Sequence, residues 1–156
     1  MELKIFGKGF NFSQDGPGNR LVYHLKGCNM RCPWCSNPEG MLPDTGDFYT
    51  LSTEEIVSEV MLSSPMFFEN GGVTFTGGEA TLQFDALLEA VKALKEKGIS
   101  VAIETNEEYM TEYAQLFADK IRKDNVDMVR EELASGEVQC HVDKDTRSDK
   151  ACCRDS

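Results

Sequence analysis

Strand-like and helix-like segments alternate through the first two thirds of the chain. Short apolar runs at residues 20–26, 72–76 and 99–103 have the length and composition of buried strands. Apolar residues recur at helical spacing over residues 53–64, after a Ser-Thr-Glu-Glu capping box, and again over residues 84–94. This alternation predicts an α/β fold in which helices pack on a parallel sheet.

The length of the chain limits how much of such a sheet can be built. A closed barrel of eight strands and eight helices takes about 250 residues, so a chain of 156 residues predicts an open, partial (β/α) barrel, truncated or divergent at its C-terminal end. A further helical face is expected over residues 110–121 and a further strand over residues 125–129. We expect residues 1–130 to form the barrel domain and residues 131–156 to form a polar tail with weak order.

Composition excludes several classes of partner and location. The net charge of −11 disfavours nucleic acid, because every phosphate contact would be made against a repulsive field. No apolar run is long enough for a membrane span, and the N-terminus lacks the apolar core of a signal peptide, so we expect a cytoplasmic protein without a membrane partner.

Residues 1–40 carry a net charge of +2, and their lysines, including Lys4, Lys8 and Lys26, either form a basic patch for an acidic partner or are scattered and solvated.

Three closely spaced cysteines indicate metal or redox chemistry. Cys28, Cys32 and Cys35 have the spacing C-x3-C-x2-C in an aperiodic stretch, residues 27–47, that follows a predicted strand. A structural zinc site needs four protein ligands, and no second cysteine pair has a suitable spacing. Cubane iron–sulfur clusters usually take four cysteines, so a group of three leaves one iron for another ligand.

The cysteine segment and two flanking motifs resemble a known family. Asp-Gly-Pro-Gly-Asn-Arg at residues 15–20, the stretch Lys26–Gly40 with its cysteines, and Thr-Gly-Gly-Glu-Ala at residues 76–80 are similar to the radical S-adenosylmethionine (SAM) superfamily. Within it, residues 3–106 resemble the activating enzymes of glycyl-radical enzymes, the pyruvate formate-lyase activase type.

The resemblance implies a cofactor pair and a reaction. Cys28, Cys32 and Cys35 would bind three irons of a [4Fe-4S] cluster, and SAM would chelate the fourth. Reductive cleavage of SAM would then give a 5′-deoxyadenosyl radical that takes a hydrogen atom from a glycine of a partner protein. The implied partners are a glycyl-radical enzyme as protein substrate and a flavodoxin or ferredoxin as electron donor.

The same resemblance assigns SAM contacts, each with a competing interpretation. Trp34 would face the adenine ring, with the backbone of Cys35 and Ser36 near the base edge, or would pack against the cysteine loop. Gly77 and Gly78 would let backbone approach the ligand, or would form an ordinary turn. The remaining candidate is Glu79, whose carboxylate would pair with the methionine ammonium.

A last candidate segment follows the third predicted strand. Glu104, Thr105 and Asn106 would approach SAM and help to hold a monovalent cation. The acid here is Glu where the activases resembled usually have Asp, and capping of the next helix is the competing role. Beyond Asn106 the later motifs of the family are not recognisable.

Other cysteines and histidines suggest no further site. His24 lies in an apolar run and is expected to be a satisfied core residue. The expected non-ligands in the tail are Cys140, His141, Cys152 and Cys153. Three alternative functions stay open: an anaerobic ribonucleotide reductase activator, a small-molecule radical SAM enzyme of the deazapurine pathway type, and a non-catalytic iron–sulfur module.

Overall fold

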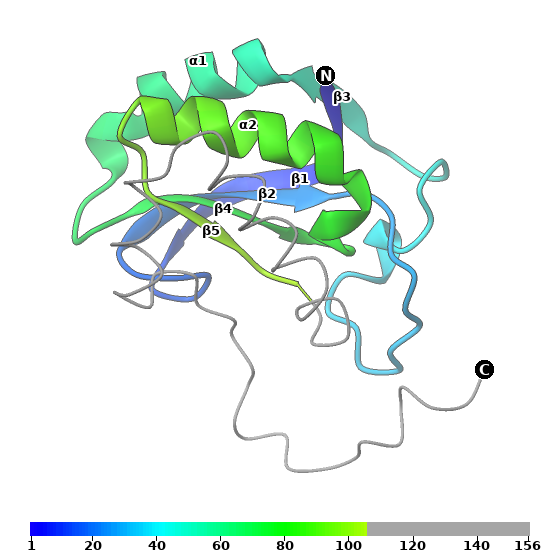
Figure 1. Ribbon diagram of the computed structural model, residues 1–156. Coiled ribbons are helices and arrows are strands. Elements are labelled where there is room, and N and C mark those ends of the chain that lie inside the picture. The colour runs from blue at the N-terminus through cyan, green and yellow to red at the C-terminus, as the bar shows by residue number, and fades with distance from the viewer. Residues whose placement is uncertain (106–156) are drawn as a thin grey trace.

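The computed structural model describes residues 1–105 of the chain and shows one open sheet with two helices on the same face (Figure 1). The helices are α1 (Thr53–Ser63) and α2 (Phe84–Glu96), and three short 3-10 helices interrupt the loops: η1 (Pro38–Gly40), η2 (Ser64–Met66) and η3 (Ala80–Gln83). The strands are β1 (Glu2–Phe12), β2 (Asn19–Leu25), β3 (Tyr49–Ser52), β4 (Gly72–Gly77) and β5 (Val101–Ile103).

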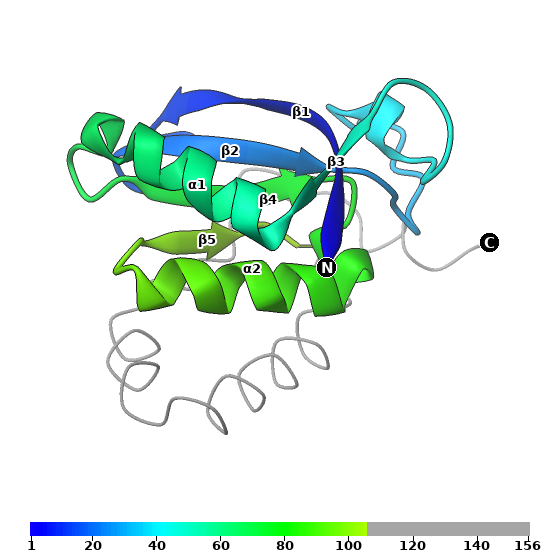
Figure 2. The same ribbon diagram turned by 90° about the horizontal axis from the view of Figure 1, so that it is seen from above.

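The sheet is mixed, with the order β3-β1-β2-β4-β5, which Figure 2 shows from above. Strands β2, β4 and β5 are parallel, so their carboxyl ends meet at one edge. Strand β1 is antiparallel to both β2 and β3. The predicted α/β fold is confirmed, but the sequence did not predict β1 and β3, because β1 carries Gly7, Gly9 and polar residues where an apolar run was sought.

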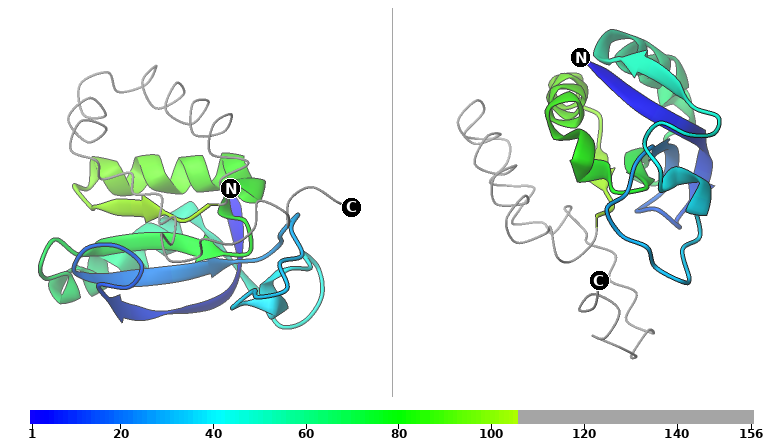
Figure 3. Two further views of the ribbon diagram at one scale, coloured as in Figure 1. Left: turned by 90° about the horizontal axis from the view of Figure 1, so that it is seen from below. Right: turned by 90° about the vertical axis from the view of Figure 1, so that its right-hand side faces the viewer.

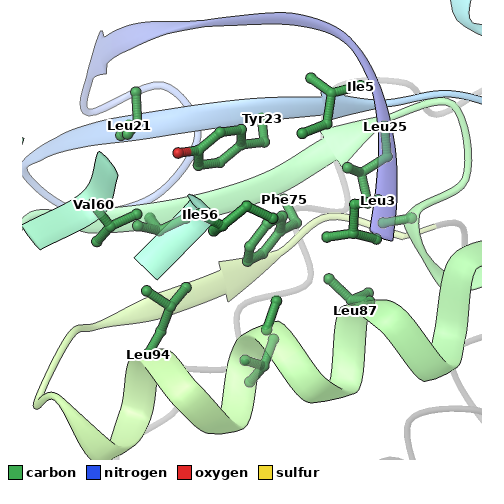
Figure 4. Packing of buried hydrophobic residues seen from close by; sticks show 14 of the residues in the cluster. Leu3, Ile5, Leu21, Tyr23, Leu25, Ile56, Val60, Phe75, Leu87 and Leu94 are labelled. Carbon is green, nitrogen blue, oxygen red and sulfur yellow. The ribbon is translucent and has the colours of Figure 1, made fainter. Parts of the chain in front are cut away.

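The core lies between the sheet and the two helices (Figure 4). Leu21, Tyr23 and Leu25 alternate along β2 and are almost completely buried on the helix side of the sheet. The rings of Tyr23 and Phe75 stack with their centroids 5.6 Å apart. Leu87 and Leu94 of α2 are also fully buried, so the 3.6-residue pattern of this helix faces the sheet as its sequence predicts.

Helix α1 begins at the predicted capping box. The Ser52 hydroxyl accepts a hydrogen bond from the Glu55 amide at 3.3 Å, and the Glu55 carboxylate accepts one from the Ser52 amide at 2.8 Å. These bonds to Ser52 lower the pKa of the Glu55 carboxyl. The helix predicted at residues 53–64 is therefore confirmed, within one residue, as Thr53–Ser63.

Several expectations fall outside the described residues. The helical face at residues 110–121, the strand at residues 125–129, the domain boundary at residue 130 and the polar tail all lie beyond residue 105. Within residues 1–105, neither helix is long and apolar enough to cross a membrane.

Candidate functional site

The cysteines lie on a long loop that leaves the carboxyl end of β2 and returns at β3. The right panel of Figure 3 looks toward this edge of the sheet. Two backbone hydrogen bonds close the loop at its base: the Gly27 amide donates to the Gly40 carbonyl at 2.7 Å, and the Cys28 amide donates to the Met41 carbonyl at 2.8 Å. The chain between Cys28 and Met41 is thus a closed loop at the edge where chemistry is expected in β/α folds.

None of the three cysteines takes part in a disulfide bond, and all three are partly exposed. The Met30 amide donates to the Cys28 sulfur at 3.4 Å, and the Cys35 amide donates to the Cys32 carbonyl at 3.1 Å in a tight turn. Their sulfurs do not converge: within residues 1–105, no three ligating side chains are grouped as a metal site. As a donor set, three reduced and accessible thiols on one closed loop fit a [4Fe-4S] cluster with three protein ligands.

The Gly-Gly-Glu turn after β4 packs directly against the base of the cysteine loop. The Gly78 amide donates to the Leu25 carbonyl at 2.8 Å, and the Glu79 amide donates to the Gly27 carbonyl at 2.7 Å. A Cβ at Gly78 would lie 2.0 Å from the Gly27 carbonyl oxygen, so a glycine is required for this approach. The structure therefore brings together two motifs that are some 50 residues apart in sequence.

The Glu79 carboxylate is buried and joins β4 to β5. Its residue is 1 % exposed, and its Oε1 atom accepts hydrogen bonds from the Thr81 amide at 2.9 Å, the Thr81 hydroxyl at 2.5 Å and the Thr105 hydroxyl at 2.7 Å. Glu79 also caps the N-terminus of η3. One oxygen of this carboxylate is thus occupied by hydrogen bonds that stabilise the fold, a structural role for Glu79 that the sequence did not predict.

Glu104 continues the same connection from the end of β5. Its amide donates to the Phe75 carbonyl at 2.9 Å, and its carboxylate accepts a hydrogen bond from the Thr76 hydroxyl at 2.5 Å. The side chains of Glu104 and Thr105 therefore both contact the strand-and-turn segment of β4. Asn106, the third predicted residue of this segment, lies outside the described residues.

Two aromatic side chains near the loop have different environments. Trp34 is 64 % exposed, so in this structure it does not pack into the loop. His24 is half-buried beside Phe6, with ring centroids 5.6 Å apart, and its Nδ1 atom is the one buried side-chain polar atom without a hydrogen-bond partner in residues 1–105. The expectation that His24 is a fully satisfied core residue is therefore wrong.

The three N-terminal lysines do not form one basic patch. Lys4 pairs with Asp44 at 2.5 Å, and Lys8 pairs with Glu59 of α1. Lys26 is only 3 % exposed. Of the two interpretations of these lysines, a single basic patch does not agree with the structure, because Lys4 and Lys8 are each paired with an acid and Lys26 is buried.

Sequence reasoning also missed a clamp beneath the loop. The Gln83 side chain donates to the carbonyls of Lys4 and Lys26, each at 3.0 Å, and accepts from the Lys4 amide at 2.7 Å. It thereby joins the beginning of β1 to the residue that follows β2, from a position just before the first residue of α2. No motif marks such a glutamine, since its partners are backbone groups.

Comparisons with known proteins identify the family of this chain. The family model of the radical SAM superfamily matches residues 22–137. A pyruvate formate-lyase-activating enzyme of Clostridium pasteurianum is 41 % identical over 92 residues, which are 58 % of this chain and 38 % of the relative. That of Streptococcus mutans is 34 % identical over 113 residues, or 68 % of this chain and 43 % of the relative.

A solved structure shows the same fold. The crystal structure of QueE from Escherichia coli matches with a TM-score of 0.54 and 21 % identity, covering 67 % of this chain and 52 % of that one. The chain spans less than half the length of the two activating enzymes. Because the family model matches most of its residues, the chain belongs to the radical SAM superfamily, a membership that implies a [4Fe-4S] cluster and SAM as cofactors.

Proposed function

We propose that this chain acts as a radical SAM enzyme that generates a glycyl radical on a partner protein. The observation that carries the proposal is the junction between the cysteine loop and the Gly-Gly-Glu turn, made by the 2.7 Å bond from the Glu79 amide to the Gly27 carbonyl. The similarity to pyruvate formate-lyase-activating enzymes supports the choice of a glycine as target.

In this proposal the cysteine loop holds the iron–sulfur cluster. Cys28, Cys32 and Cys35 are the ligands, and the fourth iron is left for SAM. When bound, the cluster and SAM supply reductive one-electron chemistry that ends in removal of a hydrogen atom from the substrate. The protein's own contribution is to fix where these groups lie and to keep water from them.

The turn and strand ends would form the remaining contacts to SAM. Gly77 and Gly78 are proposed to contact SAM through their backbone groups, because the space that their Cβ atoms would take is filled by the backbone of Leu25 and Gly27. Gly77 has the positive φ of 112° that favours glycine. Glu79 and Thr105 are held to one another at 2.7 Å, so they would present a fixed acceptor to the methionine ammonium. The further contacts we propose are Trp34 to adenine, the backbone of Cys35 and Ser36 to the base edge, and Glu104 and Asn106 beside a monovalent cation.

A glycine in an extended loop is a chemically suitable target. Loss of one Hα gives a backbone radical that the flanking amide groups stabilise and that no Cβ shields. The donor must come within a few Å of that Cα, so the glycine has to leave its own protein's core and enter the site. A flavodoxin or ferredoxin is the proposed reductant, and Lys4, Lys8 and Lys26 are not the basic patch that would receive it.

Anaerobic reconstitution and SAM cleavage test the proposal. The reconstituted chain should hold about four irons, with an electron paramagnetic resonance signal that SAM changes. Replacement of Cys28, Cys32 or Cys35 by Ala should abolish reductive SAM cleavage with dithionite, whereas replacement of Cys152 or Cys153 should not. Stoichiometric zinc with no uptake of iron would refute the cluster assignment.

The substrate is tested separately. With SAM, reductant and a glycyl-radical protein, a doublet radical signal should appear on the partner with about one 5′-deoxyadenosine per radical, and a partner with the target glycine replaced by Ala should give none. Radical formation only on a ribonucleotide reductase would favour that activator instead. 5′-Deoxyadenosine formed only with a small metabolite would favour a small-molecule enzyme, and a cluster without SAM cleavage would favour an electron-transfer module.

A further inference from the structure

Lys26 is a buried cation at the base of the cysteine loop. The residue is 3 % exposed, its Nζ atom donates a hydrogen bond to the Glu39 carbonyl, and the same atom lies 5.6 Å from the ring centroid of Phe6. The loop folds over it, since a Cβ at Gly46 would lie 3.6 Å from Nζ. Burial of an ammonium group is costly and calls for a compensating interaction.

No carboxylate forms an ion pair with this ammonium in the described part of the chain. The ion pairs within residues 1–105 join Met1 to Glu89, Lys4 to Asp44 and Lys8 to Glu59, so none includes Lys26. Glu39 and Asp47 line the same cavity of about 430 Å³ as Lys26, but neither carboxylate makes an ion pair with it. The compensation consists of a carbonyl oxygen and an aromatic face.

The side chain of Lys26 forms the first of three consecutive links across the base of the loop. Its ammonium bonds the Glu39 carbonyl, the Gly27 amide bonds the Gly40 carbonyl, and the Cys28 amide bonds the Met41 carbonyl. The third link includes the first cysteine itself. The lysine backbone is fixed as well, because its amide donates to the Lys4 carbonyl at 2.9 Å and its carbonyl accepts from Gln83 at 3.0 Å.

The position of this charge has a consequence for a cluster on the loop. Three thiolates make a cluster site negative, and each electron added makes it more negative. A cation that is buried at the base of this loop would act on that charge with less screening by solvent than an exposed cation at the same distance. Charge and burial near an iron–sulfur cluster are among the factors that set its reduction potential.

We propose that Lys26 is a positioning residue that closes the cysteine loop through its ammonium group and raises the reduction potential of the cluster through its buried positive charge, which no ion pair balances. The inference rests on the proposed cluster ligands Cys28, Cys32 and Cys35. Two substitutions separate the two roles. Lys26→Met removes both the hydrogen bond and the charge, whereas Lys26→Gln removes the charge and keeps an N–H donor on a slightly shorter side chain. Lys4→Met is the matched control, because it removes a lysine charge that is exposed and paired with Asp44.

Two measurements test the inference. Amide hydrogen exchange of the metal-free chain should show faster exchange at Gly27 and Cys28 in Lys26→Met, by about tenfold or more, with Lys26→Gln less affected and Lys4→Met like wild type. Redox titration of the reconstituted cluster by electron paramagnetic resonance should give a more negative potential in both Lys26 variants than in Lys4→Met.

The outcomes distinguish this inference from the proposed function. Unchanged exchange in Lys26→Met would overturn the closing role, and unchanged potentials in both Lys26 variants would overturn the charge role. If no cluster binds to the wild-type chain, the proposed function fails and the charge role falls with it, while the exchange measurement still decides whether Lys26 closes the loop.

Discussion

Replacement of Gly78 by Ala is the sharpest test of how the two motifs of the site are joined. The added methyl group would lie 2.0 Å from the Gly27 carbonyl oxygen, 2.7 Å from the Gly27 carbonyl carbon and 3.1 Å from the Gly40 carbonyl oxygen. All three neighbours are backbone atoms at the base of the cysteine loop, so no flexible side chain can move aside. The turn and the loop have to separate until the first contact reaches about 3.4 Å.

The size of the effect follows from what that separation breaks. The Glu79 amide loses its 2.7 Å bond to the Gly27 carbonyl, at about 1 kcal/mol. Crowding of a packed region by one methyl group adds about 2 kcal/mol. A loss of about 3 kcal/mol in a domain of this size should lower the Tm by at least about 10 °C. A displacement of about 1 Å at the site should also slow SAM cleavage by about a hundredfold.

Gly9→Ala is the matched control for this substitution. Gly9 lies in β1, and nothing is within 4 Å of the position that its Cβ would take. The same chemical change there should leave stability unchanged or raise it slightly, because alanine restricts the unfolded chain. Thermal unfolding of the metal-free chain and SAM cleavage by the reconstituted one are the measurements. If Gly78→Ala matched Gly9→Ala in both, the close approach of turn and loop would be refuted.

Three further predictions concern single side chains. Thr105→Val removes the 2.7 Å hydrogen bond to the buried Glu79 carboxylate, so the affinity for SAM should fall. Thr105→Ser keeps the hydroxyl donor and should keep the affinity, and equilibrium binding of SAM to the reconstituted chain is the measurement. Burial and the nearby Glu59 carboxylate raise the pKa of Tyr23 above its ordinary 10.0. The contribution of this residue to the free energy of unfolding should therefore be complete below pH 10 and fall as the pH rises further, and urea unfolding of Tyr23→Phe should not show this decrease. The pKa of Glu55 is lowered from 4.5 by its bonds with Ser52, so stability present above that pH should be lost on acidification, and Glu55→Gln should lack this loss down to about pH 3.

The parallel part of the fold could be predicted because each element carries its own local signal. β-Branched and aromatic residues mark β4, and helical spacing of apolar residues marks α1 and α2. Strand β1 has only a short alternating signal, at Leu3 and Ile5, and its outer half consists of two glycines, two polar residues and two exposed phenylalanines. Its pairing with β2 and β3 depends on contacts distant in sequence, which override weak local propensity.

Only those residues of the candidate site whose side chains have a distinctive chemistry could be predicted from the sequence. The cysteines and the Gly-Gly-Glu turn are recognisable because thiols and paired glycines are chemically distinctive. Lys26 and Gln83 are not, because they bond to carbonyl groups that every residue has. The ion pairs of Lys4 and Lys8 depend on acids 40 and 51 residues away. A charge count along the sequence cannot tell a paired or buried lysine from a free one.

The way in which the site is joined also predicts where substitutions will do harm. The cysteine loop meets β4 through backbone groups: Gly27 bonds Gly40 and Glu79, and Leu25 bonds Gly78. Backbone bonds tolerate most side chains but no change in the spacing of the backbones. Harmful substitutions should therefore concentrate at glycines that permit close approach and at Lys26, whose side chain adds a further link across the loop base. Substitutions at residues that do not bind iron are thus expected to reduce the iron content of the reconstituted chain.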